Sequence, residues 1–107
     1  MVFPPSIEVL YIEECPQWQA ALRLARSAAR RAGAGEVDVF ATEVRSKAQA
    51  LRLGFAGSPT ILVDGRDPFP GAPTTEPACR IFQTPHGWAA LPDGDQLAQA
   101  IRLASAR

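Results

Sequence analysis

The sequence predicts a single α/β domain, residues 1–107, in which helices flank a central four-stranded mixed sheet. Two observations predict this class. Short, β-branched apolar runs alternate with longer segments whose apolar residues recur at helical spacing. A chain of 107 residues also fits one domain and leaves no room for a second hydrophobic core. The expected order of elements is βαβαββα.

The first strand and the first helix are the clearest unit of the pattern. Residues 7–12 read Ile-Glu-Val-Leu-Tyr-Ile, an apolar and β-branched run that is typical of a buried strand. Pro16 suits the first position of the following helix, because its missing N–H would have no partner there. Gly33 is expected to end this helix. The positions expected to face the core are Trp18, Leu22, Ala25, Ala29 and Ala32.

A second strand and helix repeat this arrangement. Residues 36–41, Glu-Val-Asp-Val-Phe-Ala, form the second strand, and a right-handed crossover places it beside the first strand and parallel to it. Thr42 is expected to cap the second helix, and Gly54 to close it. The inward-facing positions of that helix are Val44, Ala48 and Leu51.

The third and fourth strands are expected on either side of a long loop. Residues 60–64, Thr-Ile-Leu-Val-Asp, form a short β-branched strand. Residues 65–77 are rich in proline and glycine, which defeats a sheet ladder and indicates a loop. Residues 79–84 resume as a fourth strand, antiparallel to the third, and residues 85–92 form a turn region.

Polar residues in the second half of the chain indicate caps and turns more than a reactive site. Asp93, with Gln96 three residues later, resembles a capping box that opens the last helix. His86 lies in a turn without metal-ligand spacing, so we expect a surface residue. A charged corner with a turn and ion-pair role is expected from Asp64, Arg66 and Asp67.

Composition excludes several classes of partner. Lys plus Arg and Asp plus Glu number 11 each, so the formal net charge is zero and argues against nucleic acid or an anionic membrane. No apolar run approaches the roughly 20 residues of a membrane span. The N-terminus lacks a basic leader, and we therefore expect a cytoplasmic protein. The arginines expected on the solvated face of the first helix are Arg23, Arg26, Arg30 and Arg31.

Two short motifs stand at the ends of predicted strands. Glu14-Cys15-Pro16-Gln17-Trp18 joins the first strand to the first helix, and Gly57-Ser58-Pro59-Thr60 opens the third strand. With these motifs and this order of elements, the chain resembles the thioredoxin-like superfamily over nearly its whole length. The resemblance implies a reactive Cys15 and a cis Ser58–Pro59 bond beside it, which costs only about 0.5–1 kcal/mol before proline.

The longer strings at residues 57–69 and 78–84 are also similar to a family of small bacterial thioredoxin-fold proteins, some of them labelled alkylmercury lyase. The chain departs from the redox pattern at one position. Trp18 stands where the second cysteine of Cys-x-x-Cys would be, so the motif is a monothiol Cys-Pro-x-Trp. Dithiol exchange within one helical turn therefore cannot run.

Two effects on the Cys15 thiol oppose each other. As the N-cap, its sulfur would lie near the positive end of the helix dipole, which can lower a thiol pKa from about 8.5 into the range of about 3.5–7.5. Glu13 and Glu14 disfavour a neighbouring thiolate, although strand alternation leaves at most one of them near the sulfur. The alternative is a small residue that caps a helix and has no chemistry.

The position of Cys79 depends on the register of the fourth strand. If the third and fourth strands form a regular hairpin with Asp64 opposite Cys79, four residues at about 3.3 Å each separate its sulfur from Cys15 by more than 10 Å. A disulfide cannot span that distance. A shifted register would bring the two cysteines together. A role for Cys79 as a small core residue stays open beside a functional one.

Three functions are compatible with these residues. The first is thiol–disulfide redox or glutathione-linked chemistry without a cofactor. Cys15 is the nucleophile and Cys79 or an external thiol resolves it. Extended peptides or glutathione then pair with the backbone edge at Ser58–Pro59. The residues expected to line the substrate groove are Pro16, Trp18, Ser58, Pro59 and Thr60.

The second function is a soft-metal or organomercury site with Cys15 and Cys79 as paired thiolates. The third is an interaction module without chemistry, in which the proline-rich loop at residues 69–77 meets a partner or a second copy. The expected partners are protein or small-molecule thiols, and the expected state is a monomer or a weak homodimer. Trp18 is expected to pack on the inner face of its helix, with shielding of the sulfur as a second role.

Overall fold

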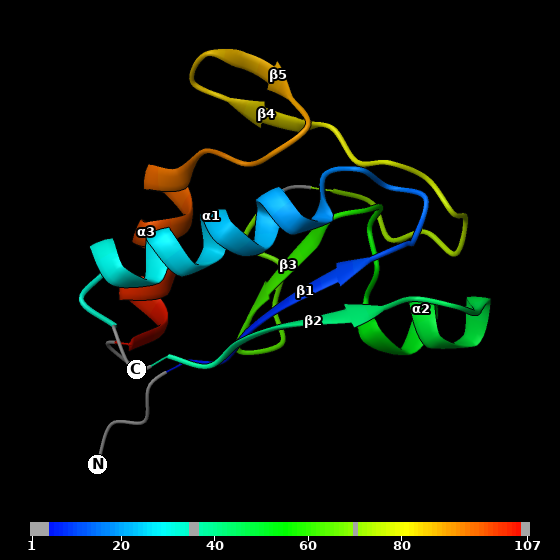
Figure 1. The fold of residues 1–107 in the computed structure, drawn as a ribbon, viewed down its shortest axis with the longest axis horizontal. Coiled ribbons are helices and arrows are strands. Elements are labelled where there is room, and N and C mark those ends of the chain that lie inside the picture. The colour runs from blue at the N-terminus through cyan, green and yellow to red at the C-terminus, as the bar shows by residue number, and fades with distance from the viewer. Residues whose placement is uncertain (1–4, 35–36, 70, 106–107) are drawn as a thin grey trace.

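The computed structural model describes residues 5–34, 37–69 and 71–105. Within these ranges a central sheet is built from β1 (Ile7–Tyr11), β2 (Val39–Glu43) and β3 (Thr60–Val63), in the order β2-β1-β3 (Figure 1). β2 pairs parallel with β1, and β3 pairs antiparallel with it. The predicted α/β class with a mixed sheet is confirmed. In the described part of the chain, however, the central sheet has three strands and not four.

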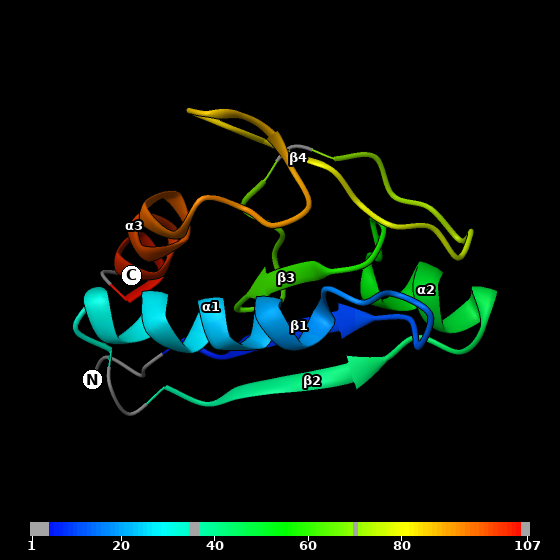
Figure 2. The same cartoon turned by 45° about the horizontal axis from the view of Figure 1, so that its top comes forward.

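Helices cover both faces of the sheet, as expected (Figure 2). α1 (Trp18–Arg31) and α3 (Gly94–Ser105) pack against each other over one face, and α2 (Lys47–Leu53) packs against the other. Successive side chains of a strand point to opposite faces. Val9 therefore packs with α1 and α3, whereas the next residue, Leu10, packs on the side of α2.

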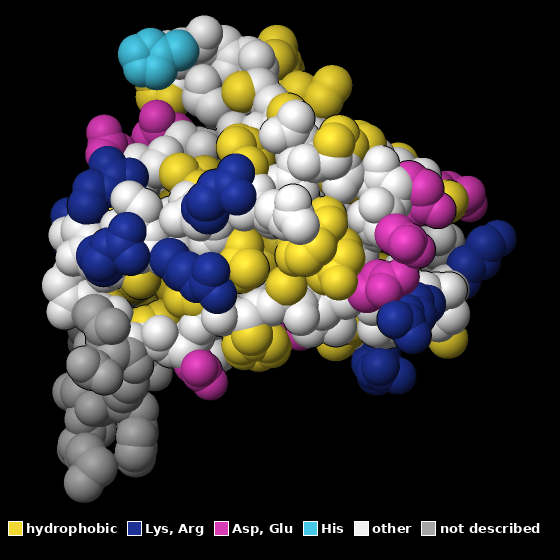
Figure 3. All heavy atoms as spheres, in the orientation of Figure 1, with side chains coloured by type: hydrophobic (Ala, Val, Ile, Leu, Met, Phe, Trp, Pro, Cys, Tyr) yellow, Lys and Arg dark blue, Asp and Glu magenta, His cyan; other side chains and the backbone are white. Residues whose placement is uncertain are grey.

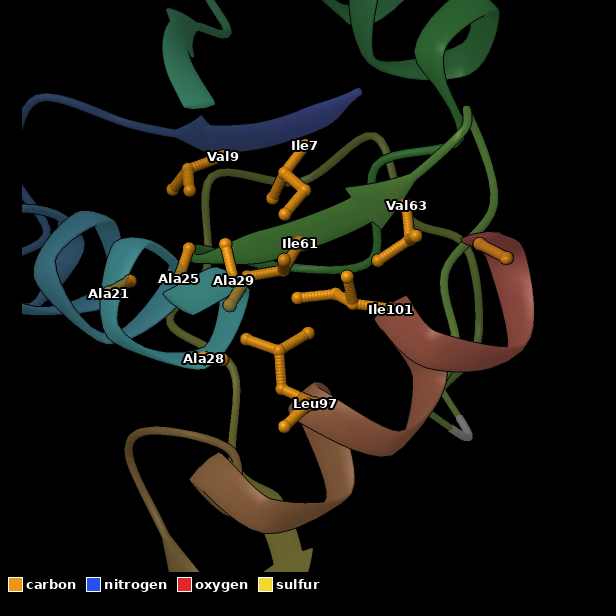
Figure 4. Close-up of a cluster of buried hydrophobic side chains, with 12 residues drawn as sticks. Ile7, Val9, Ala21, Ala25, Ala28, Ala29, Ile61, Val63, Leu97 and Ile101 are labelled. Atoms are coloured by element: carbon orange, nitrogen blue, oxygen red, sulfur yellow. The ribbon is translucent and has the colours of Figure 1, made fainter. Parts of the chain in front are cut away.

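The larger core lies between the sheet and the pair α1 and α3 (Figure 4). The side of α1 that it buries is rich in alanine, which lets α3 approach closely. Ala25 and Ala29 are buried as predicted, but the buried face is rotated toward Ala21 and Ala28, because α1 contacts α3 as well as the sheet. The buried members are Ile7, Val9, Ala21, Ala25, Ala28, Ala29, Ile61, Val63, Leu97, Ala98, Ile101 and Ala104.

The second helix begins later than the sequence predicts. Ser46, not Thr42, is the N-cap of α2, and its hydroxyl accepts a hydrogen bond from the backbone N–H of Gln49 at 3.1 Å. Thr42 instead belongs to β2, where its hydroxyl donates to the Glu8 carboxylate at 2.6 Å. The later start turns the helix. The predicted inward position Leu51 is 75% exposed, and Ala48 is exposed as well.

The sequence predicts that residues 79–84 form a fourth strand beside β3, but they do not. β4 (Phe82–Thr84) pairs antiparallel with β5 (Gly87–Ala89) in a separate two-stranded sheet (Figure 1). The predicted turn region 85–92 therefore contains a strand. The cause lies at the end of β3, where Asp64 and Gly65 adopt positive φ angles of 53° and 78° and lead the chain away from the sheet.

The remaining predictions concern loops and helix ends. The described residues of the loop 65–77 contain no regular strand, as expected, apart from one isolated bridge between Val63 and Arg66. The Asp93 carboxylate accepts from the Gln96 N–H at 3.0 Å, which confirms the predicted cap of α3. Glu36, the predicted first residue of the second strand, lies outside the described residues. In the described part of the chain, no helix has the length and apolar character needed to cross a membrane.

Candidate functional site

Cys15 lies in the turn between β1 and α1, just ahead of the helix. Its backbone N–H donates to the Ile12 carbonyl at 3.1 Å. The N-cap of α1 is Gln17, so the prediction that Cys15 occupies that position is wrong. An extra turn over residues 13–17 separates the strand from the helix and moves Cys15 back from the helix tip. Its side chain is buried at 1% exposure and belongs to the core on the α2 side of the sheet.

Ser58 is the residue that the Cys15 sulfur contacts. Cys15 Sγ donates to the Ser58 carbonyl at 3.5 Å, and the Ser58 hydroxyl accepts from the Ile12 N–H at 3.2 Å. The Ser58–Pro59 bond is cis, which confirms that expectation. Thr60 holds the other side of this bend, because its hydroxyl donates to the Gly57 carbonyl at 2.5 Å. Ser58, Pro59 and Thr60 are all buried and do not line an exposed groove.

A short segment, Ala78–Arg80, runs across Ser58 and is called the strap here. The Ser58 N–H donates to the Ala78 carbonyl at 2.8 Å, and the Arg80 N–H donates to the Ser58 carbonyl at 2.9 Å. These two bonds form an isolated parallel bridge that pairs Ser58 with Cys79. The strap therefore places Cys79 opposite the same peptide unit that holds Cys15.

The two cysteine side chains meet at this point. Cys15 Sγ contacts the Ser58 carbonyl and Cys79 lies opposite Ser58, so the chain adopts the shifted register that brings the cysteines together and not the regular hairpin that would separate them by more than 10 Å. The register is the reason: Cys79 lies opposite Ser58, at the start of β3, and not opposite Asp64 at its end. Both cysteines are free thiols, with Cys15 buried and Cys79 exposed. The fold thus places beside Cys15 the second thiol that the Cys-Pro-x-Trp motif lacks.

The environment raises the pKa of the Cys79 thiol. The largest cause is loss of hydration against neighbouring residues, followed by repulsion from Cys15 as a thiolate. The hydrogen bond between the two side chains acts in the same direction, because it favours protonated Cys79. The neighbouring Cys15 therefore makes the Cys79 thiol harder to ionise.

A cavity of about 400 Å³ borders the segments that precede both cysteines. Glu13 and Glu14, both exposed, lie on one wall, and Glu76 lies on the wall that leads to the strap. Acidic side chains gather at this end of the molecule (Figure 3). On the rim, Arg45 pairs with Glu43 at 3.0 Å, and this hydrogen bond together with the charge of Glu43 raises the pKa of Arg45.

The other predicted site residues lie around the turn. Trp18 is half-buried and stacks on Tyr11 with ring centroids 4.1 Å apart, outside the buried clusters of the core. Pro16 is exposed beside Cys15. His86 is exposed, as expected. The predicted ion-pair role of the corner near the end of β3 is confirmed for Asp67, which binds Arg80 at 2.6 Å.

Arg80 is the residue of this site that the sequence did not indicate. Its side chain is 4% exposed, and it directly follows Cys79 in the strap. Arginine is almost never fully buried unless it is paired, so a buried arginine beside a cysteine marks a specific local arrangement. The spacing of Asp67 and Arg80 along the chain carries no periodic signal that would have revealed their pairing.

The described residues hold no group of three or more His, Cys, Asp or Glu side chains that could bind a metal ion. In the comparisons with known proteins, neither a protein-family model nor a curated protein nor a solved structure matches this chain.

Proposed function

We propose that this protein is a thioredoxin-like thiol–disulfide redox protein whose reactive pair is Cys15 and Cys79. The observation that carries the proposal is the approach of both cysteines to Ser58: Cys15 Sγ donates to its carbonyl at 3.5 Å, and Cys79 lies opposite it in an isolated bridge. The order β2-β1-β3, with β3 antiparallel and a cis Ser58–Pro59 bond at its start, supports the thioredoxin-like part of the proposal. The strap supplies the attacking thiol from a distant part of the chain.

Exposure divides the work between the two thiols. Cys79 is exposed and reaches a substrate from solvent, whereas Cys15 is covered. In this scheme the Cys79 thiolate attacks one sulfur of a substrate disulfide, forms a mixed disulfide and releases the other sulfur as a thiolate. The Cys15 thiolate then attacks the Cys79 sulfur, which forms the Cys15–Cys79 disulfide and releases the second substrate thiol. The substrate gains two electrons and the cysteine pair loses two.

A low-molecular-weight thiol of the glutathione class returns the pair to its reduced form. Its thiolate attacks the exposed Cys79 sulfur and releases Cys15. A second thiol then attacks the mixed disulfide, releases Cys79 and leaves as the oxidised dimer of the reductant. No cofactor takes part, and the expected partners are protein or small-molecule thiols and disulfides.

The strap changes which substrates fit. The backbone N–H and C=O of Ser58 are both bonded to Ala78 and Arg80, so an extended peptide cannot pair with this edge while the strap is in place. A small disulfide, or a disulfide that protrudes from a partner protein, reaches Cys79 without that pairing. The proposal therefore places substrates on the solvent side of the strap.

A redox titration tests the proposal. The reduced protein is equilibrated with mixtures of reduced and oxidised glutathione, quenched with a thiol-alkylating reagent and analysed by mass spectrometry. We expect one transition between a dithiol form and an intramolecular Cys15–Cys79 disulfide. Cys15→Ser should stop at a glutathione adduct on Cys79, and Cys79→Ser should react slowly because Cys15 is buried. A wild-type protein that forms only glutathione adducts would remove the proposal.

The same proximity favours a second function, capture of a soft metal ion or an organomercurial between two thiolates. Soft thiolate ligands select ions such as Cu(I). Competition between the reduced protein and a Cu(I) chelator measures this directly. The second function requires one ion per protein, with binding lost in both Cys15→Ser and Cys79→Ser. Equal binding by wild type and the double serine variant contradicts it.

A further inference from the structure

Arg80 directly follows Cys79 and is anchored far more firmly than its exposed neighbours in the strap. We propose that Arg80 is a positioning residue that holds the Cys79 sulfur against Cys15 and so sets the redox equilibrium of the pair. This inference rests on the proposed redox function. In this proposal Arg80 acts on the Cys79 sulfur through the backbone of the strap.

Contacts with Asp67, Phe69 and Phe82 hold the Arg80 side chain. One guanidinium nitrogen binds the Asp67 carboxylate at 2.6 Å, and another donates to the Phe69 carbonyl at 3.1 Å. The guanidinium carbon also lies 4.4 Å from the centre of the Phe82 ring, which meets Phe69 edge to face. The planar guanidinium group can make all three contacts at once, whereas a lysine ammonium provides neither the fork nor the flat face.

Two glycines leave room for this arginine. A Cβ on Gly57, whose φ angle is +101°, would lie 3.0 Å from Arg80 Cβ. A Cβ on Gly71 would lie 2.7 Å from the terminal guanidinium nitrogen. Gly57 therefore bounds the backbone end of the side chain, and Gly71 bounds its charged end. The fold accommodates Arg80 along its whole length.

The strap needs such an anchor because it has little else to hold it. Ala78 and Cys79 are both exposed. Two backbone hydrogen bonds pair the strap with Ser58, just before β3, and one of them uses the Arg80 N–H. A guanidinium fixed at Asp67 therefore restrains the backbone nitrogen one residue beyond Cys79. Loosening it spreads the positions of the Cys79 sulfur.

The equilibrium between the cysteine pair and glutathione measures this restraint. Its constant has units of concentration and reports the effective concentration of one thiol at the other. We expect Arg80→Lys, which keeps the charge, and Asp67→Asn, which keeps the shape, each to lower it by about tenfold or more, or about 30 mV in potential. Gly71→Ala should do the same, because its methyl group displaces only the guanidinium end.

Controls separate positioning from general loss of structure. Arg31 and Asp95 form a bond of the same length, 2.6 Å, between exposed side chains. Arg31→Lys and Asp95→Asn should leave the effective concentration unchanged. In a Cys15→Ser background, Arg80→Lys should not slow the reaction of Cys79 with oxidised glutathione, because Cys79 is exposed in either case. Thermal unfolding of each reduced variant verifies that it folds.

The outcomes distinguish this inference from the function beneath it. If wild type forms no Cys15–Cys79 disulfide, the redox function fails and Arg80 has nothing to position. If wild type forms it and Arg80→Lys, Asp67→Asn and Gly71→Ala all keep the wild-type constant, the role of Arg80 alone is overturned. Equal losses in the Arg31 and Asp95 controls also overturn it. Should Arg80→Lys fail to fold, Gly71→Ala carries the same test.

Discussion

Ser58 joins three segments that are far apart in the chain. Its hydroxyl receives the Ile12 N–H, its carbonyl receives both the Cys15 thiol and the Arg80 N–H, and its own N–H binds Ala78. A buried polar group that is fully hydrogen-bonded specifies one arrangement, because each lost bond leaves an unpaired group behind. The site therefore depends on a backbone unit, which no side-chain motif in the sequence reports.

The raised pKa of Cys79 gives a pH dependence with a definite sign. At a given pH, a raised pKa means less thiolate and slower alkylation. Cys15→Ala removes the repulsion and the hydrogen bond that Cys15 contributes. The pH midpoint of Cys79 alkylation, followed with iodoacetamide, should therefore move to lower pH. Part of the shift remains, because desolvation is its largest cause.

Cys15→Ser is the matched control for this measurement. Serine carries no charge in this pH range but keeps an atom able to hydrogen-bond Cys79. Its midpoint should lie between those of wild type and Cys15→Ala. A Cys15→Ala midpoint equal to the wild-type value contradicts contact between the two thiols.

A comparison of alanine substitutions at Gly57 and Gly87 distinguishes the cost of backbone strain from the cost of a steric clash. Both have positive φ angles, +101° and +107°, but a Cβ meets Arg80 at Gly57 and nothing within 4 Å at Gly87. Alanine at Gly87 should cost about 1–2 kcal/mol for the left-handed backbone alone. Gly57→Ala adds the clash and should cost about 1–3 kcal/mol more, as overpacking does. Urea unfolding of the two variants measures the difference, and equal losses would contradict the close approach of Arg80.

The cap of α2 can be tested at the scale of the element. Ser46→Ala removes the hydroxyl that accepts from the Gln49 N–H and should lower the free energy of unfolding by about 1 kcal/mol. Ser46→Asp keeps an acceptor at the cap and should retain most of the stability. Circular dichroism during urea unfolding reports both. A Ser46→Ala variant as stable as wild type would show that the cap contributes nothing.

The elements differ in how far the sequence could predict them. β1 and α1 follow from local signals, a β-branched run and a terminal glycine at Gly33. The prediction that Pro16 is the first helical residue is wrong, because α1 begins at Trp18 after the N-cap Gln17. α2 begins four residues later than predicted, because Thr42 and Ser46 are both good caps and the choice depends on Thr42 binding Glu8 across the sheet. Local propensity cannot rank two such residues when a long-range contact decides between them.

The fourth strand shows the same effect over a longer range. Its register was predicted from a regular hairpin across the loop 65–77, but residue 79 bridges Ser58 and residues 82–84 pair with β5. A long loop imposes no register, so the pairing is set by the Asp67–Arg80 ion pair and by the turn at the end of β3. The sequence alone therefore left two registers open, one that separates Cys15 from Cys79 and a shifted one that brings them together, and the chain adopts the second.

For the whole molecule, stability depends on the core between the sheet and the helices α1 and α3. Leu97 and Leu103 both belong to α3, but Leu97 is fully buried and Leu103 is 61% exposed. Leu97→Ala should therefore lower the free energy of unfolding by about 2–5 kcal/mol. Leu103→Ala should stay within about 0.5 kcal/mol of wild type. Chemical denaturation checks both, and similar losses would contradict the orientation of α3.

The pairing of Ser58 with Ala78 and Arg80 has a thermodynamic consequence for anything that binds there. A foreign chain that takes over these hydrogen bonds must first expel the protein's own chain, and its apparent affinity falls by the fraction of time the edge is vacant. Displacement of the strap from Ser58 also separates the Cys79 sulfur from the Cys15 sulfur. By thermodynamic linkage, a Cys15–Cys79 disulfide weakens the binding of such a chain by the same factor by which the bound chain disfavours the disulfide.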